Sequence, residues 1–213
     1  MTVTKKILRR YTNLPSVIHM LSTRRITFLS PTRWDDRNDS YFMELYKDAK
    51  KLKTLLAICF SQETETYHHW RVFADGSSGV CVAFHKQQLI DIVCQQRGVT
   101  TGEVDYVRIN DLDHYFRTVL ALPFLKRAPF EPENEFRFVY GSKREELGSL
   151  DVEMNLSAID RIYLSPWMPE SIANSVKDAL QTAAGSAHVK VTRSTLIQND
   201  RWAEYGRRVA SSK

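Results

Sequence analysis

Two uninterrupted apolar runs of strand length constrain the fold most strongly. They are residues 55–60, Leu-Leu-Ala-Ile-Cys-Phe, and residues 79–84, Gly-Val-Cys-Val-Ala-Phe. A strand with one wet face alternates polar and apolar residues, whereas a continuous run predicts burial on both faces. Apolar residues recur at helical spacing in residues 86–96 and 169–183. This mixture of β-α-β units and adjacent strands predicts an α/β (α+β) fold, with a mixed central β-sheet flanked by helices.

The chain length predicts a single globular domain over residues 1–213, since 213 residues suffice for one hydrophobic core. Residues 197–213 are expected to form a charged C-terminal tail or helix. The spacing of apolar residues also predicts an amphipathic helix over residues 111–122.

Composition gives expectations about location and partners. Three cysteines are an odd number, which disfavours a disulfide framework. The N-terminus lacks a signal-peptide stretch, and no run reaches the roughly 20 apolar residues of a membrane span. We therefore expect cytoplasmic residence and no membrane contact. The formal charge of +5 comes from separated Lys and Arg pairs, which is compatible with a nucleotide or nucleic-acid partner but also with ordinary surface charge. The sequence does not indicate the oligomeric state.

Residues 130–137, Phe-Glu-Pro-Glu-Asn-Glu-Phe-Arg, form the candidate functional segment. Residues 132–140 alternate like a strand, which places Glu133, Glu135 and Arg137 on one face. A buried carboxylate without a partner is costly, so such a row either faces water or is paired and used. One interpretation is an edge strand with a solvated Glu–Arg ladder. The other makes one Glu a general base or electrostatic stabiliser, with Arg137 holding a neighbour or a phosphate.

A second polar segment, residues 34–40, has the sequence Trp-Asp-Asp-Arg-Asn-Asp-Ser. Its carboxylates are the hard oxygen ligands that divalent cations prefer, but it lacks the Gly and the regular alternation of a calcium loop. The simpler interpretation is a turn in which Asp39 or Ser40 caps a helix that begins at Tyr41. We assign no metal site from this segment.

Several motif classes are missing from the sequence. It contains neither a Gly-rich phosphate loop nor a Gly-x-Ser-x-Gly elbow. His68 and His69, with Cys59 and Cys81, have zinc-binding atoms but not the spacing of a zinc motif. Walker-type nucleotide hydrolysis and serine-hydrolase chemistry are therefore disfavoured.

Six short segments follow one another in a recognisable order. They are Arg10-Tyr11, Ser30-Pro31 with residues 35–39, Cys59-Phe-Ser61, Trp70-Arg-Val-Phe-Ala74, residues 79–84 and Glu133-Asn-Glu-Phe-Arg137. In this order and spacing the chain resembles a bacterial family catalogued as domain of unknown function 2971, over residues 7–165. Phe73 and Phe130 stand where that family usually has a Tyr and a Trp. The family name implies no activity, so function must be argued from the site.

The opening Arg10-Tyr11-Thr12, followed by Asn-Leu and a helix, resembles that of ADP-ribosyltransferase folds of the DNA-modifying type. This resemblance implies that Arg10, Tyr11 and Thr12 hold NAD as a substrate. It also implies that Glu135 or Glu133 on a late strand stabilises the oxocarbenium-like ribosyl centre. The expected activity is that of an NAD-consuming ADP-ribosyltransferase-like or glycohydrolase-like enzyme, of a kind found among bacterial toxins and phage-defence effectors.

Two other functions remain open from the residues. A divalent-metal-dependent nuclease or phosphoesterase would use Asp36, Asp39, Glu133 and Glu135 as oxygen ligands. A non-catalytic module would bind a nucleotide or nucleic acid through its paired Lys and Arg residues, with salt-sensitive affinity.

Overall fold

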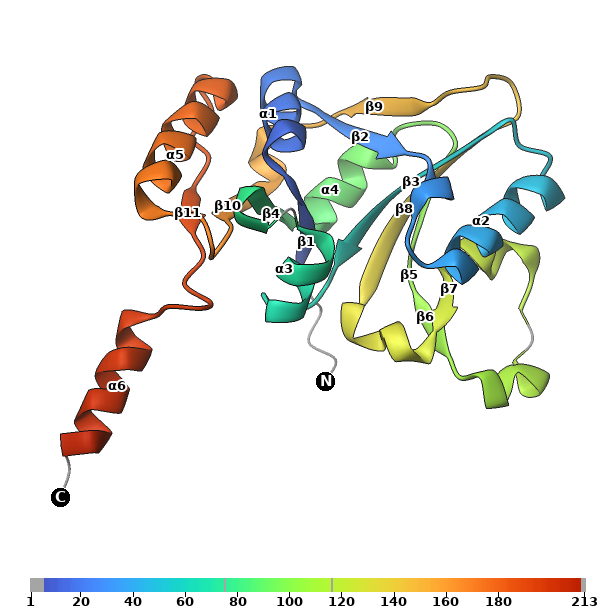
Figure 1. Cartoon of the computed structure of the whole chain (residues 1–213). Coiled ribbons are helices and arrows are strands. Elements are labelled where there is room, and N and C mark those ends of the chain that lie inside the picture. Colours follow the sequence, from blue (N-terminus) through green and yellow to red (C-terminus); the bar gives the residue numbers. More distant parts are fainter. Residues whose placement is uncertain (1–5, 75, 116, 212–213) are drawn as a thin grey trace.

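A branched, mixed β-sheet with helices on its faces makes up the single domain (Figure 1). The computed structural model describes residues 6–211 except residues 75 and 116. Strand β11 lies parallel to β10, and the other pairs of the large sheet are antiparallel, which confirms the predicted fold class. The strands of this sheet are β1 (Ile7–Asn13), β2 (Arg25–Leu29), β3 (Thr54–Ser61), β4 (Gly79–His85), β5 (Val99–Glu103), β8 (Glu135–Ser142), β9 (Ser149–Glu153), β10 (Ile159–Leu164) and β11 (Val191–Arg193).

Smaller elements complete the domain. Strands β6 (Asp105–Val107) and β7 (Leu125–Arg127) form a separate parallel pair. The α-helices are α1 (Leu14–Thr23), α2 (Arg37–Ala49), α3 (Tyr67–Phe73), α4 (Lys86–Val93), α5 (Glu170–Ala184) and α6 (Asp200–Ser211). The 3₁₀ helices are η1 (Pro31–Arg33), η2 (Gly76–Ser78), η3 (Ile109–His114), η4 (Val119–Phe124), η5 (Ala128–Glu133) and η6 (Leu156–Ala158).

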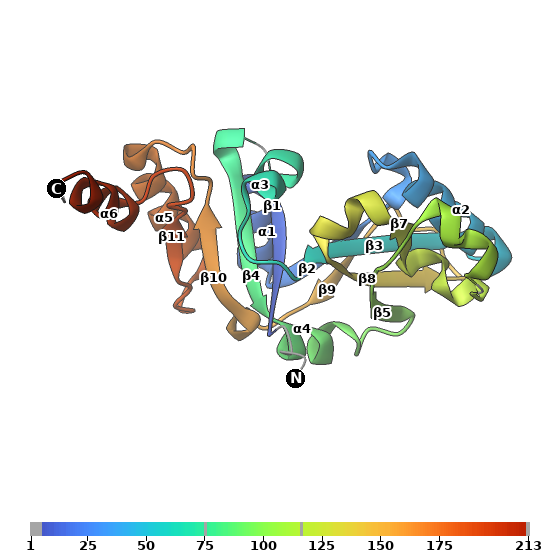
Figure 2. The same ribbon diagram turned by 90° about the horizontal axis from the view of Figure 1, so that it is seen from below.

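The sheet forks at β3, and this fork positions the candidate site. One edge of β3 pairs with β8 from Thr54 to Ser61. Its other edge meets β1 at one register position, Arg9 opposite Ser61, and β2 at another, Leu29 opposite Ala57. Strand β1 therefore leaves β3 and continues along β4, and Figure 2 shows β4 and β10 running across the direction of β3 and β8. The two parts of the sheet diverge from this point.

The two faces of β3 and β8 have different chemistry. On one face, Ile58, Phe60 and Phe138 are buried in the main hydrophobic core. On the other face, a smaller cluster including Ala57 and Val139 packs against α2. Because side chains alternate along a strand, the remaining positions on this second face carry polar residues of β8. The chain thus places charged groups beside the smaller cluster.

Helix α1 begins directly at the end of β1. The Asn13 side chain accepts hydrogen bonds from the Ser16 backbone N–H at 3.0 Å and from the Ser16 hydroxyl at 2.8 Å. Pro15 occupies the first turn, where a backbone N–H has no intrahelical acceptor. Asn13 therefore ends β1 and starts α1, and α1 packs against β1, β2 and α5.

We expect Asn13→Ala to lower the free energy of unfolding by about 1 kcal/mol, because it leaves an N-terminal amide of α1 without its side-chain acceptor. Urea denaturation followed by circular dichroism measures this change. Asn110→Ala is the control, since no described residue hydrogen-bonds to the exposed Asn110 side chain. Equal stability of the two variants would contradict the capping role.

Two predicted elements are wrong. Residues 111–122 do not form one α-helix; the described part contains η3 and η4 instead. Leu112 and Leu120 are 54% and 60% exposed, so their apolar stripe lacks the packing that stabilises a short helix. The strand predicted over residues 132–140 begins only at Glu135, because Asn134 takes a left-handed conformation at the end of η5.

Helix α6 extends away from the body of the molecule in both views (Figures 1 and 2). All twelve of its residues are exposed. Among the helices that the structure describes, none has the length and apolar composition of a membrane-spanning segment.

Candidate functional site

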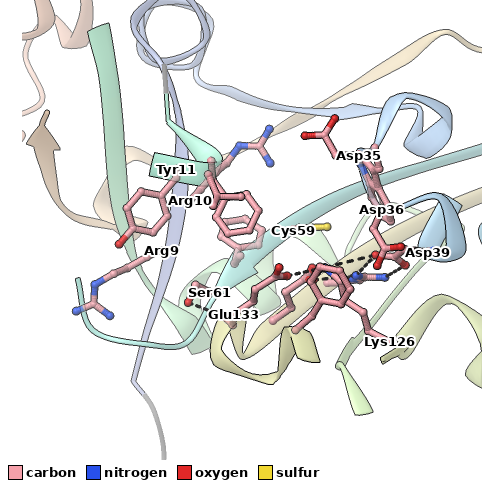
Figure 3. Close-up of a pocket in the computed structure, with 18 of the residues that line it drawn as sticks. Arg9, Arg10, Tyr11, Asp35, Asp36, Asp39, Cys59, Ser61, Lys126 and Glu133 are labelled. Atoms are coloured by element: carbon pink, nitrogen blue, oxygen red, sulfur yellow. Dashed lines mark hydrogen bonds and ion pairs between the residues drawn. The ribbon is translucent and has the colours of Figure 1, made fainter. Parts of the chain in front are cut away.

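A cavity of about 460 Å³ lies where β1 and β3 part (Figure 3). Residues of β1, β3, β8, α2, α3, β7 and η5 contribute to its lining. The cavity brings together β1 and β8, which are more than a hundred residues apart in the sequence. The polar face of β8 forms one of its walls.

The cavity brings five of the six predicted site residues together. Arg10 and Tyr11 line it from β1, Glu133 lines it from η5, and β8 contributes Glu135 and Arg137. Thr12 is not among its lining residues. Glu133 reaches the cavity from the 3₁₀ helix that precedes β8 rather than from the strand itself.

Arg137 is committed entirely to protein partners. Its side chain is 0% exposed. It donates two hydrogen bonds to Asp39, at 2.7 and 2.6 Å, two to Glu135, both at 2.9 Å, and one to the Pro123 carbonyl at 3.1 Å. A guanidinium has five N–H donors, so these bonds use all of them. Arg137 therefore organises the carboxylates and has no donor left for a ligand.

Lys126 of β7 links the two glutamates. Its ammonium group donates to Glu133 Oε2 at 2.5 Å and to Glu135 Oε1 at 2.7 Å, and it lies 3.8 Å from Asp39 Oδ2. Its side chain is 8% exposed, so little water screens these charges. Lys126 was not predicted from the sequence, because a single Lys in a short strand has no local pattern that marks it.

The two glutamates are in different electrostatic environments. Burial opposes the ionisation of Glu135, but the charges and hydrogen bonds of Arg137 and Lys126 outweigh it and hold the pKa of Glu135 well below its usual range. Burial and the neighbouring Glu135 raise the pKa of Glu133 to about 7, against the opposing effect of Lys126. Near neutral pH the pair therefore consists of an ionised Glu135 and a Glu133 that exchanges a proton.

Two aspartates of the polar loop, Asp36 and Asp39, have structural partners. Asp36, not Asp39 or Ser40, caps α2, and its Oδ1 accepts from the Asn38 and Asp39 backbone N–H groups at 3.0 and 3.4 Å. The predicted cap is wrong because the helix begins at Arg37, which places Asp39 in the first turn, where its side chain points to Arg137.

The geometry does not support the divalent-cation alternative. Lys126 and Arg137 already supply the positive charge between the carboxylates of Asp39, Glu133 and Glu135. Over the described ranges, no group of three or more His, Cys, Asp or Glu side chains is arranged to hold a metal ion.

The β1 wall is rich in donors. Arg9 points away from the other labelled side chains in Figure 3 and donates to the Glu63 carbonyl at 2.7 Å. The Arg10 side chain has neither a hydrogen bond nor an ion pair to any described residue, and burial lowers its pKa. An unpaired guanidinium beside a cavity is suited to an anionic ligand.

Three buried polar atoms in the described part of the chain lack hydrogen-bond partners: Arg9 Nε, the Tyr11 hydroxyl and Asp36 Oδ2. All three belong to residues that line this one cavity. Buried polar atoms are nearly always paired, so water or a ligand is expected to complete the bonds of each of these atoms. The Tyr11 ring itself is held by stacking on His69, with 5.4 Å between ring centroids.

His69 of α3 is hydrogen-bonded to Ser61, a β3 residue that lines the cavity. Its Nε2 lies 3.0 Å from the Ser61 hydroxyl, and Ser61 donates to the Glu133 carbonyl at 2.8 Å. Its Nδ1 is hydrogen-bonded to Thr66. Both ring nitrogens therefore have protein partners, and this chain of bonds fixes the end of η5 that carries Glu133.

Comparison with known proteins gives a limited result. No protein-family model and no curated protein sequence matches the chain, so the resemblance to the bacterial family of unknown function depends on the motifs alone. Among solved structures, the chain is similar to Thermus sp. 2.9 DarT in complex with NAD⁺, with a TM-score of 0.47 and 9% identity over 91% of this chain and 98% of that chain. It is also similar to the same protein in complex with ADP-ribosylated ssDNA, with a TM-score of 0.45 and 11% identity over 89% of this chain and 94% of that chain. At such low identity the function has to be argued from the residues of this cavity.

Proposed function

We propose that the cavity binds NAD and that the protein cleaves the bond between nicotinamide and ribose, as an ADP-ribosyltransferase-like or glycohydrolase-like enzyme. The observation that carries this proposal is that one cavity has a cation on one wall and carboxylates on another. An unpaired cation, Arg10, lies on the β1 wall, and a pair of carboxylates, Glu133 and Glu135, lies at the β8 wall. NAD has the matching polarity, because its pyrophosphate is anionic and its nicotinamide ring is cationic.

The chemistry follows from the two glutamates. When the C1′–N bond breaks, the bonding electrons leave with nicotinamide, and positive charge develops on the ribose. The ionised Glu135 stabilises that charge across a site with little water. Glu133, whose pKa is raised to about 7, accepts the proton of the attacking water or acceptor group. Lys126 holds both carboxylates in place, Arg137 holds Glu135, and neither cation has a direct role in bond breaking.

The direct test is to incubate the protein with NAD in the presence of EDTA, alone and with a cell lysate as a source of acceptors. Chromatography then measures released nicotinamide. The proposal expects release that persists in EDTA, because no step uses a metal ion. Binding of NAD without release in either condition would favour the non-catalytic nucleotide-binding module instead. A role as a toxin or phage-defence effector further requires that expression of the active protein lowers cellular NAD or ADP-ribosylates a cellular acceptor.

We expect Arg10→Gln to raise the KM for NAD by about 10- to 100-fold, with a smaller change in kcat, because it removes a charge-assisted contact to phosphate. Initial rates of nicotinamide release measure both constants. Arg25→Gln is the matched control, since Arg25 pairs with Glu153 on the exposed β2–β9 edge and does not line this cavity. An unchanged KM in Arg10→Gln would remove Arg10 from the binding site.

A further inference from the structure

Among the residues that the structure describes, Lys126 is the one lysine that lines the cavity. It comes from β7, which belongs to the small two-stranded sheet and not to the sheet that carries Glu135. The Lys126 ammonium lies 4.7 Å from the centre of the Phe130 ring, on the segment that leads to Glu133. Strand β7 and η5 thus close over the polar face of β8 and bring a cation into contact with both glutamates.

The division of contacts separates the role of Lys126 from that of Arg137. Glu135 accepts hydrogen bonds from two donors of Arg137 and from Lys126. Glu133 accepts one side-chain hydrogen bond, from Lys126, and Arg137 has already used its five donors elsewhere. Lys126 is therefore the cation on which Glu133 depends.

The charge count of the cluster explains why this dependence matters. Three carboxylates, Asp39, Glu133 and Glu135, face two cations, Lys126 and Arg137, so the fully ionised cluster has one negative charge in excess. Like charges at short range do not both stay ionised in a dry site, and one proton is retained. Without Lys126 the excess grows, and that proton is held more tightly.

We propose that Lys126 is a positioning residue for the NAD-cleaving reaction, which holds Glu133 against Glu135 and sets the pH at which Glu133 gives up its proton. The inference rests on the proposed function. The charged or titratable groups around Glu133 are Lys126 from β7, Glu135 and Arg137 from β8, Asp39 from α2, Tyr106 from β6 and His69 from α3. Of these, Lys126 is the one whose removal withdraws a positive charge in direct contact with Glu133.

The sign of the effect follows from linkage. A nearby cation favours the ionised form of a carboxyl group, so losing Lys126 raises the pKa of Glu133. If ionised Glu133 accepts the proton, the rate rises with pH as Glu133 ionises. The acidic limb of the pH–rate profile then moves to higher pH when the cation is lost.

The experiment measures nicotinamide release from about pH 5 to about pH 9 for Lys126→Met, Lys126→Arg and Lys86→Met. We expect the limb to move up by about one pH unit or more in Lys126→Met, and to return close to its original position in Lys126→Arg. Lys86→Met is the matched control, because Lys86 also pairs with a Glu, Glu103 at 2.9 Å, and lies 4.5 Å from the centre of a Phe ring, but does not line the cavity. A limb that stays in place in Lys126→Met while the rate falls uniformly would overturn the proposal.

Failure of the proposed function has a different signature. If the wild-type protein releases no nicotinamide, the NAD proposal fails. A carbon-13 NMR titration of the glutamate carboxyl groups still measures whether Lys126 controls the pH at which Glu133 titrates. An upward shift of the Glu133 titration in Lys126→Met supports control by Lys126, and an unchanged titration overturns it.

Discussion

Replacing Arg137 with Met is expected to lower the free energy of unfolding by about 3–5 kcal/mol, because it leaves two buried carboxylates without their main partner. Asp39 and Glu135 are 4% and 7% exposed, and each accepts two hydrogen bonds from Arg137. Met fills a similar volume, so the loss of charge pairing dominates over the loss of packing. Equilibrium denaturation in urea measures the change.

Two comparisons separate this effect from ordinary loss of an ion pair. Arg161→Met removes the partner of Asp160 at a site where both side chains are about one third exposed, and we expect a change of about 0–1 kcal/mol. The triple variant Asp39→Asn, Glu135→Gln, Arg137→Met removes the charges together and should recover much of the stability that Arg137→Met loses. If Arg137→Met is no less stable than Arg161→Met, the account of this cluster is contradicted.

Replacing the glutamates with Gln is expected to have the largest effect on activity. Removing a carboxylate that stabilises transition-state charge should lower kcat for nicotinamide release by about 100-fold or more in Glu135→Gln. Glu133→Gln should lower kcat by about 100-fold and abolish the acidic limb of the pH–rate profile, because the proton acceptor is lost. Gln keeps the shape of the side chain, so the cavity is expected to persist.

Glu131→Gln is the control for both variants, since Glu131 is an exposed residue of η5 and does not line the cavity. Thermal unfolding of each variant must accompany the rates, because Glu135 also holds Arg137. Full activity in Glu133→Gln and in Glu135→Gln would remove both residues from the reaction.

The sequence predicted the centre of the fold because burial on both faces leaves a local mark. The continuous apolar runs became β3 and β4, the strands at the middle of the sheet. The alternation from Glu135 to Phe138 correctly separated the polar face of β8 from the core face. In contrast, the pattern over residues 111–122 has helical spacing, but Leu112 and Leu120 of its apolar stripe are exposed, so the predicted helix is wrong.

The site itself was only partly predictable, since its essential features come from long-range pairing. The fork depends on two register positions, Arg9 opposite Ser61 and Leu29 opposite Ala57, and neither produces a local pattern. Lys126 enters the site through β7, a strand of three residues that no periodicity indicated. The sequence shows the carboxyl group of Asp39 but not its pairing with Arg137, which lies 98 residues away.

The most direct measurement of the central claim is a crystal structure of the protein with a non-hydrolysable NAD analogue. The account predicts that the dinucleotide lies in the cavity at the fork, with its pyrophosphate on the Arg10 side and its nicotinamide ribose beside Glu133 and Glu135. An analogue bound elsewhere, or bound here with its phosphates against the glutamates, would contradict it.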